Sequence, residues 1–85
     1  MQPKHLEQSV YDLEGIRIVV RANAGHQCMP YSFQRMAANN ASITEWLTQR
    51  VLPSANGAEV EVVNGFGGTP HGRTKLSTVR ESYAT

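Results

Sequence analysis

Hydrophobic and polar positions alternate in two segments of this chain, residues 16–22 and residues 58–63, and this alternation indicates β-strands. The first segment is rich in β-branched residues and places Arg17 and Arg21 on the same face, because strand side chains alternate between faces. In the second segment, glutamates alternate with valines. We therefore expect two half-buried strands whose arginines and glutamates pair across the sheet.

A further strand is expected before the first of these. Residues 9–13 alternate loosely between polar and apolar side chains, and Glu14 and Gly15 are then available for a tight turn. The pattern predicts a β-hairpin that opens the domain, with residues 9–13 paired to residues 16–22.

One helix is indicated both by its start and by its apolar face. Ser42 and Glu45 form a capping box, in which the serine hydroxyl accepts from an amide of the first turn and the glutamate reaches back. Apolar residues follow at helical spacing, namely Ile43, Trp46, Leu47 and Val51. Because Pro53 has no amide hydrogen, we predict that this helix begins at Ile43 and ends near Leu52.

Two shorter helices are also expected. Residues 32–38 contain apolar side chains at positions i, i+3 and i+4, which is typical of one helical face. Near the C-terminus, Leu76, Val79 and Tyr83 recur at i, i+3 and i+7. This spacing favours a short final helix, while the β-branched residues within it leave a strand as the alternative.

The expected elements place this chain in the α+β class. Their order is ββααβ followed by a short C-terminal element, so we predict a three- to four-stranded antiparallel or mixed sheet with one or two helices packed on one face. We expect residues 1–85 to form a single domain, and 85 residues with 40% hydrophobic content support only a small core. Association stabilises domains of this size, so a homodimer or an obligate partner is expected.

Glycines and cationic side chains gather in residues 64–75, which hold four of the seven glycines of the chain. We expect a flexible loop here, since glycine permits positive φ and lets a ligand approach the backbone closely. His71, Arg73 and Lys75 supply donors suited to anions. The loop also approximates a phosphate-binding pattern, but Arg73 replaces the lysine and Pro70 lacks an amide, so a partner-binding loop and a plain connector are the stronger alternatives.

His26 and Cys28 lie two residues apart and are the other candidates for chemistry. They could act as base and nucleophile, or as two metal ligands with His5 and His71 as further nitrogen donors. No orienting acid, oxyanion hole or cofactor motif is recognisable, and a lone cysteine is more often a small buried side chain. We therefore predict no enzymatic activity, no metal and no cofactor, with a small hydrolase that uses these residues as an alternative.

The overall charge of the chain is close to neutral. Eight Lys and Arg residues against seven Asp and Glu residues give a net charge of +1, too small for nonspecific attraction to nucleic acid or to a membrane. A single cysteine fits a reducing compartment. The first residues lack the apolar run of a signal peptide, and no segment approaches the ~20 apolar residues that cross a bilayer. We expect a cytoplasmic protein with no membrane partner.

These features favour a small interaction module of the kind that phages and other mobile elements encode, acting as an inhibitor or regulator. The expected partner is another protein or a protein–nucleic acid complex, and direct nucleic-acid binding by the same cations is the alternative. The residues expected to contact the partner or its anionic groups are Arg73, Lys75, Arg80 and His71, with Phe66 and Tyr83 as aromatic anchors.

Overall fold

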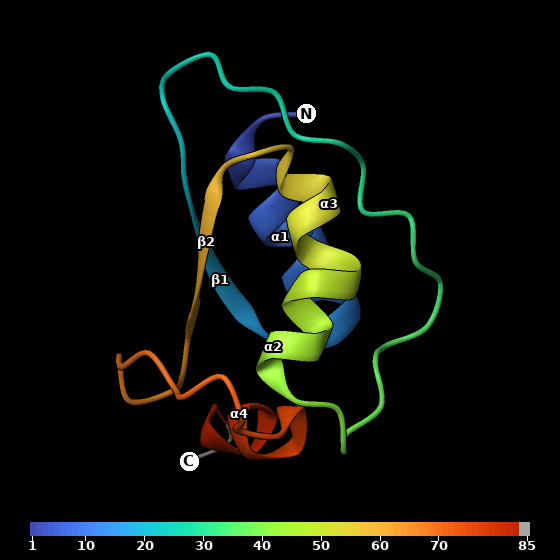
Figure 1. Ribbon diagram of the computed structural model, residues 1–85, viewed down its shortest axis with the longest axis vertical. Helices are drawn as coiled ribbons and strands as arrows, with labels where there is room; N and C mark the ends of the chain where they lie inside the picture. The colour runs from blue at the N-terminus through green and yellow to red at the C-terminus, as the bar shows by residue number, and fades with distance from the viewer. Residues whose placement is uncertain (84–85) are drawn as a thin grey trace.

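The chain folds into two layers, a short β-sheet and the helices that cover one of its faces (Figure 1). A computed structural model describes residues 1–83. The elements in chain order are α1 (Pro3–Glu14), β1 (Arg17–Arg21), α2 (Ile43–Trp46), the π-helical turn η1 (Leu47–Val51), α3 (Leu52–Ala55), β2 (Glu59–Val63) and α4 (Leu76–Ser82). α2, η1 and α3 form one continuous helical segment, and α4 lies across one end of the molecule. None of the helices in the described part of the chain has the length and apolar character needed to cross a membrane.

Both strands that the alternation predicts are present, and they pair antiparallel. β1 turns Ile18 and Val20 into the core and exposes the residues on either side of them. On the exposed face, Nη2 of Arg21 lies 2.9 Å from Oε2 of Glu61, which is the expected cross-strand ion pair. Among the described residues, Arg17 makes no such pair, and its guanidinium lies beside aromatic rings instead.

The α+β class is confirmed, but the predicted three- to four-stranded sheet is wrong, because the sheet of residues 1–83 has two strands. Residues 9–13, expected as the first strand of a hairpin, lie within α1. Pro3 occupies the first turn of this helix, where its missing amide is not needed, and Gly15 ends the helix in a left-handed conformation with φ 69°. Leu6 and Val10, four residues apart, are fully buried, so the helical period organises this segment.

The helix that begins at α2 continues beyond its predicted end at Leu52 and reaches Ala55. Pro53 lies inside it, directly after the π-helical turn η1. In this turn the amide of Leu52 donates to the carbonyl of Leu47, five residues back. A proline in a regular helix clashes with the carbonyl four residues before it, and the wider π turn gives the ring room. The prediction that Pro53 ends the helix is therefore wrong.

Residues 32–38 are a predicted helix that does not form. They belong to an irregular segment that leaves β1, passes along the helical layer and leads into α2 (Figure 1). The amide of Met29 in this segment donates to the carbonyl of Ser54 at 2.8 Å, and the amide of Ala37 donates to the carboxylate of Glu14 at 2.7 Å. Bonds to the helical layer thus take the place of bonds within a local helix.

The core lies between the sheet and the helices, and α4 closes it at one end. The predicted C-terminal helix is confirmed, and it buries Leu76 and Val79. Trp46 is the largest fully buried side chain. The buried apolar residues are Leu6, Val10, Ile16, Ile18, Val20, Cys28, Ala37, Ile43, Trp46, Val51, Ala55, Val62, Leu76 and Val79. Every helix and strand described above contributes to this set.

One charged side chain, Glu14 at the end of α1, is buried beside these apolar residues with no exposed surface. Its carboxylate accepts hydrogen bonds from the irregular segment, the helical segment and α4. The donors are Oη of Tyr31 (2.5 Å), the amide of Ala37 (2.7 Å), Nε1 of Trp46 (2.9 Å), Nη1 of Arg50 (3.0 Å) and Nη2 of Arg80 (3.3 Å). Because two of these donors are guanidinium groups, the buried negative charge is compensated.

The pKa values of this cluster follow from its hydrogen bonds. Burial alone raises the pKa of Glu14, but the bonds from Tyr31, Trp46, Ala37 and Arg50 together outweigh it and hold the pKa below its usual value. Burial and the bond to the carboxylate raise the pKa of Tyr31, so its hydroxyl stays protonated and donates. The fold therefore stabilises the ionised form of Glu14.

We predict that Glu14→Gln lowers the free energy of unfolding by about 3 kcal/mol at pH 7, because Arg50 and Arg80 then lose their buried counter-charge. Urea denaturation followed by circular dichroism measures this change. The exposed acid of the sheet is the matched control: Glu61→Gln removes the partner of Arg21 at the surface and should change stability little.

The same variant should alter the response to acid. Since the pKa of Glu14 is lower in the folded protein than in the unfolded chain, its stabilisation is complete above the unfolded value of 4.5 and is lost as the pH falls through the folded value. The wild type should therefore lose stability on acidification below about pH 4.5, and this part of the loss should be missing from Glu14→Gln. Equal acid profiles for the two proteins would contradict the role of Glu14 as the charged centre of the core.

Candidate functional site

Residues 64–75 connect β2 to α4 at one end of the sheet (Figure 1, orange). Their first half is a closed turn organised by Asn64, whose Oδ1 atom accepts from the amides of Phe66 at 2.9 Å and Gly68 at 3.0 Å. The amide of Asn64 donates to the carbonyl of Gly68 at 2.9 Å, and Gly67 takes a φ of 82° that glycine adopts without strain. Bonds between side chain and backbone therefore hold this turn.

The turn lies directly on the last turn of α4. The amide of Gly65 donates to Oγ of Ser82 at 2.8 Å. A Cβ atom on Gly65 would collide with the backbone carbonyl of Ser82, so a larger residue would have to move the loop or the helix. Glycine at this position allows two backbones to pack closely.

The second half of the loop is bonded to the start of α2. The amide of Thr44 donates to the carbonyl of Gly72 at 3.0 Å, and the amide of Ile43 donates to the carbonyl of Thr74 at 2.9 Å. The first amides of a helix have no partner within the helix. Loop carbonyls supply these partners here and anchor the loop at the same time.

Several backbone amides near the phosphate-binding pattern are already engaged in internal hydrogen bonds. The predicted cap of α2 is confirmed, because the amide of Glu45 donates to Oγ of Ser42 at 3.2 Å. Within the loop, the amide of Arg73 donates to Nδ1 of His71 at 3.1 Å, in addition to the amides bonded to Asn64. The hypothesis of a phosphate-binding loop therefore gains no support from the geometry.

The side chains of the loop border a hollow of about 290 Å³ between the loop and α4. It is lined by Phe66, Pro70, Thr74, Thr78, Val79 and Glu81, among others. Phe66 is 76% exposed, more than any other large hydrophobic side chain of residues 1–83. His71, Arg73 and Lys75 are exposed along the second half of the loop, and none of the ion pairs between described residues includes them.

Arg80, which the sequence predicts as a surface contact, is held inside the fold. Its Nε donates to the carbonyl of Glu14 at 2.8 Å and its Nη1 donates to the carbonyl of Ala37 at 2.9 Å. With the bond from Nη2 to the carboxylate of Glu14, these contacts leave the side chain 13% exposed. The structure thus separates Arg80 from the exposed cations of the loop.

Tyr83 is directed to the end of the sheet. Its hydroxyl donates to the carbonyl of Val63 and accepts from the amide of Arg17 at 3.0 Å, so it bridges the last residue of β2 and the first residue of β1. Burial raises the pKa of Tyr83 although the neighbouring Arg17 opposes this shift, and the hydroxyl remains protonated. Tyr83 therefore joins α4 to the sheet.

His26 and Cys28 converge on the end of α3. Nε2 of His26 lies 2.9 Å from the carbonyl oxygen of Ala55, and Sγ of Cys28 lies 3.9 Å from the same oxygen. Burial raises the pKa of Cys28, which disfavours the thiolate that a nucleophile or a metal ligand requires. Within residues 1–83, no cluster of three or more His, Cys, Asp or Glu side chains is placed to hold a metal ion.

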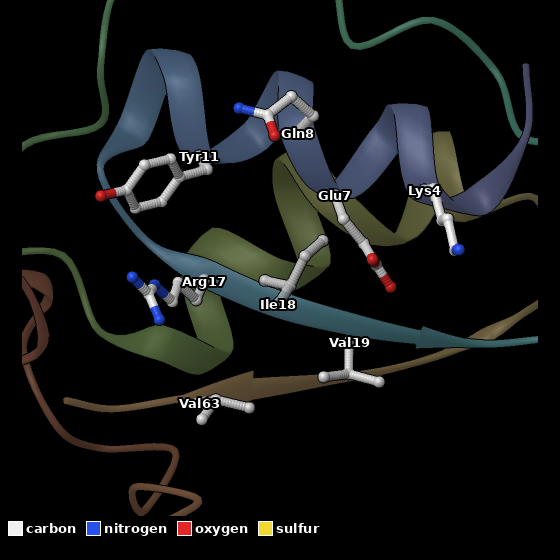
Figure 2. A pocket seen from close by; sticks show the side chains of 8 residues that line it. All are labelled: Lys4, Glu7, Gln8, Tyr11, Arg17, Ile18, Val19 and Val63. Atoms are coloured by element: carbon white, nitrogen blue, oxygen red, sulfur yellow. The ribbon is translucent and has the colours of Figure 1, made fainter. Parts of the chain in front are cut away.

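A second surface lies between α1 and β1. It encloses a larger hollow of about 590 Å³, which we call the β1 furrow (Figure 2). It is lined by Lys4, Glu7, Gln8, Tyr11, Arg17, Ile18, Val19 and Val63. The residues from α1 stand at i, i+3, i+4 and i+7, so the helical period would have placed them on one face. Because residues 9–13 were predicted to form a strand, this shared helical face was not recognised.

We predict that Gly65→Ala destabilises the protein by about 1–3 kcal/mol, because the added methyl group meets the carbonyl of Ser82. Gly68→Ala is the matched control: its methyl group would lie at an ordinary 3.6 Å from the side chain of Asn64 and should change stability by less than about 0.5 kcal/mol. Thermal denaturation and hydrogen exchange of the α4 amides measure both. Equal effects of the two variants would show that the loop does not pack on α4.

The chain matches no protein-family model, and neither curated proteins nor solved structures match it at a significant level. Its function has to be inferred from the chemistry of its own surface.

Proposed function

We propose that this protein is a small non-enzymatic interaction module that binds a macromolecular partner and acts on it as an inhibitor or regulator. The proposed contact surface is the exposed side of residues 64–75 with the adjoining face of α4. The observation that carries the proposal is Phe66, an aromatic side chain that is 76% exposed beside a hollow of about 290 Å³. Aromatic side chains in such positions commonly anchor protein interfaces.

Burial of Phe66 by a partner would be the main source of affinity. A fully buried aromatic side chain is worth roughly 1.5–3 kcal/mol relative to an exposed one. Pro70 and Thr78 are among the residues that line the hollow beside it. Such a hollow suits an apolar side chain of the partner, and the two contacts together form the desolvated centre that tight interfaces need.

Three exposed donors supply the polar part of this surface. His71, Arg73 and Lys75 lie along the second half of the loop, outside the ion pairs of the described residues. Cations at the rim of an interface act mainly on association rate and on the choice of partner. We therefore expect a partner whose contacting surface is acidic around an apolar centre.

The internal bonds of the loop support this proposal. Asn64 holds the turn that presents Phe66, and the carbonyls of Gly72 and Thr74 are bonded to α2. Ordering a loop on binding costs free energy, and a loop that is already ordered avoids much of that cost. A surface built in this way binds with little rearrangement.

Direct nucleic-acid binding is the second candidate, because Arg73 and Lys75 share the loop with an exposed aromatic ring. Single strands are held by aromatic rings on which bases stack within a basic groove. The net charge of +1 provides little long-range attraction to phosphates, which favours a protein partner. The single cysteine, Cys28, fits action in the cytoplasm, where thiols remain reduced.

Phe66→Ala is expected to weaken binding of the partner captured from cell lysate by about 30-fold, because the aromatic anchor is lost. Arg73→Ala/Lys75→Ala should instead slow association and reduce its dependence on salt. Surface plasmon resonance at several salt concentrations separates these effects. Arg21→Ala/Arg35→Ala removes two exposed cations elsewhere on the surface and serves as the charge-matched control.

Capture with and without nuclease distinguishes the two candidate functions. A protein partner should remain bound after nuclease treatment, whereas loss of every partner on nuclease treatment alone would favour nucleic acid. A nucleic-acid partner should also show a steep fall of log affinity with log salt. Retention of all partners at wild-type affinity by both loop variants would refute the loop as the contact surface.

A further inference from the structure

A long groove follows β1 on the side of α1. Its first part is the β1 furrow of about 590 Å³ (Figure 2). A second hollow of about 470 Å³ shares Lys4 and Glu7 with the furrow and continues past Val20 to His26. The two hollows together run from the first residue of β1 to the segment beyond its last residue. An elongated site parallel to a strand fits an extended chain better than a compact small molecule.

β1 directs backbone hydrogen-bonding groups toward this groove at Ile18, which lines the furrow although the residue is only 5% exposed. The amide of Val20 donates to Oε2 of Glu7 in α1 at 2.8 Å, so the backbone of Val20 faces away from β2. In an antiparallel pair alternate residues face opposite edges, so Ile18 also directs its amide and carbonyl away from β2. Arg17 has the opposite orientation, because its amide donates to the hydroxyl of Tyr83 on the β2 side.

The furrow also carries positive charge that residues 1–83 do not neutralise. The guanidinium of Arg17 lies 5.6 Å from the ring centroid of Tyr11 and 5.7 Å from that of Tyr83, and these rings orient the cation without cancelling its charge. Lys4 is exposed, and the ion pairs of the described residues include neither cation. The carboxylate that lines the furrow, Glu7, already accepts from a β1 amide.

We propose that the β1 furrow binds an extended acidic segment of a partner protein, which pairs with β1 at Ile18 as a third strand and places a carboxylate on Arg17. Ile18 supplies the main-chain bonds, and Arg17 supplies a charge-assisted one. Val19 and Val63 line the furrow and offer apolar contact to alternate side chains of the segment. The furrow shares no lining residue with the hollow beside residues 64–75, so this site is additional to the proposed function of that loop.

Single-stranded nucleic acid is the competing occupant, because the cations Arg17 and Lys4 line the same furrow as the aromatic ring of Tyr11. Two features favour the peptide. The carboxylate of Glu7 in the middle of the groove repels a phosphate backbone, which is charged at every unit, whereas a peptide can place an uncharged residue beside it. The amide and carbonyl of Ile18 match the bonding pattern of another polypeptide strand, which a phosphate backbone cannot reproduce because it has no donors.

The test selects nonapeptides from a phage-displayed random library on the full chain and measures the affinity of the enriched peptides by fluorescence anisotropy. We expect them to carry Asp or Glu among β-branched residues. Arg17→Ala should weaken their binding at least about tenfold, and Arg17→Lys should keep part of it. Arg21→Ala, on the same face of β1 but outside the furrow, should bind as the wild type does.

Hydrogen exchange followed by NMR locates the bound peptide. The amide of Ile18 should exchange at least about tenfold more slowly in the complex, because it gains a strand partner, while the amides of residues 64–75 should not change. Arg73→Ala/Lys75→Ala should bind the peptide normally. The experiment can therefore show that the furrow does not bind a peptide without deciding whether residues 64–75 form a contact surface, and the reverse also holds.

Several results would overturn this site. They are the absence of any enriched peptide, enriched peptides that lack acidic residues, and unchanged affinity in an Arg17→Ala variant whose melting temperature matches that of the wild type. Binding of oligothymidylate that depends on Arg17 and protects no Ile18 amide would assign the furrow to nucleic acid instead. Arg17→Gln removes the charge but keeps a long polar side chain, and it serves in place of Arg17→Ala if the alanine variant does not fold.

Discussion

The carboxylate of Glu14 is ionised and has no exposed surface, a state that is strongly unfavourable unless hydrogen-bond donors surround it. The donors come from Tyr31 in the irregular segment, Trp46 and Arg50 in the helical segment, and Arg80 in α4. A two-stranded sheet is marginally stable on its own. The hydrogen bonds to Glu14 therefore join the irregular segment, the helical segment and α4, which so small a sheet cannot hold together alone. The positions of these elements depend on one another through the carboxylate.

Short-range signals predict much of this fold. Alternation identified both strands, and the cap at Ser42 identified the start of α2. The prediction of a hairpin was wrong because the side chains of residues 9–13 fit both the strand period and the helical period. The residues that indicate a helix most clearly, Pro3 at its start and Gly15 at its end, lie outside this short segment. The burial of Glu14 could not be predicted in this way, because its side-chain donors Tyr31 and Arg80 stand 17 and 66 residues away along the chain.

The candidate site was predictable to a similar degree. The glycine cluster indicated a loop, and the exposed positions of Arg73 and Lys75 agree with the polar character of that segment. Spacing alone could not show that Arg80 turns inward, because its acceptors belong to other elements. The β1 furrow as a groove between a helix and a strand was missed for the same reason as α1. The residues of α1 that line it share one face in a helix, but not in the strand that was predicted for part of this segment.

The contact between Glu14 and Arg80 has a kinetic consequence, since it joins residues 66 positions apart in the chain. During synthesis the carboxylate must stay hydrated until α4 has left the ribosome, because its last cationic donor does not exist before then. Contacts of such long sequence separation slow folding, as loop closure precedes any compensating interaction. The chain is therefore expected to fold late and in one cooperative step, and its apolar residues remain exposed until α4 emerges.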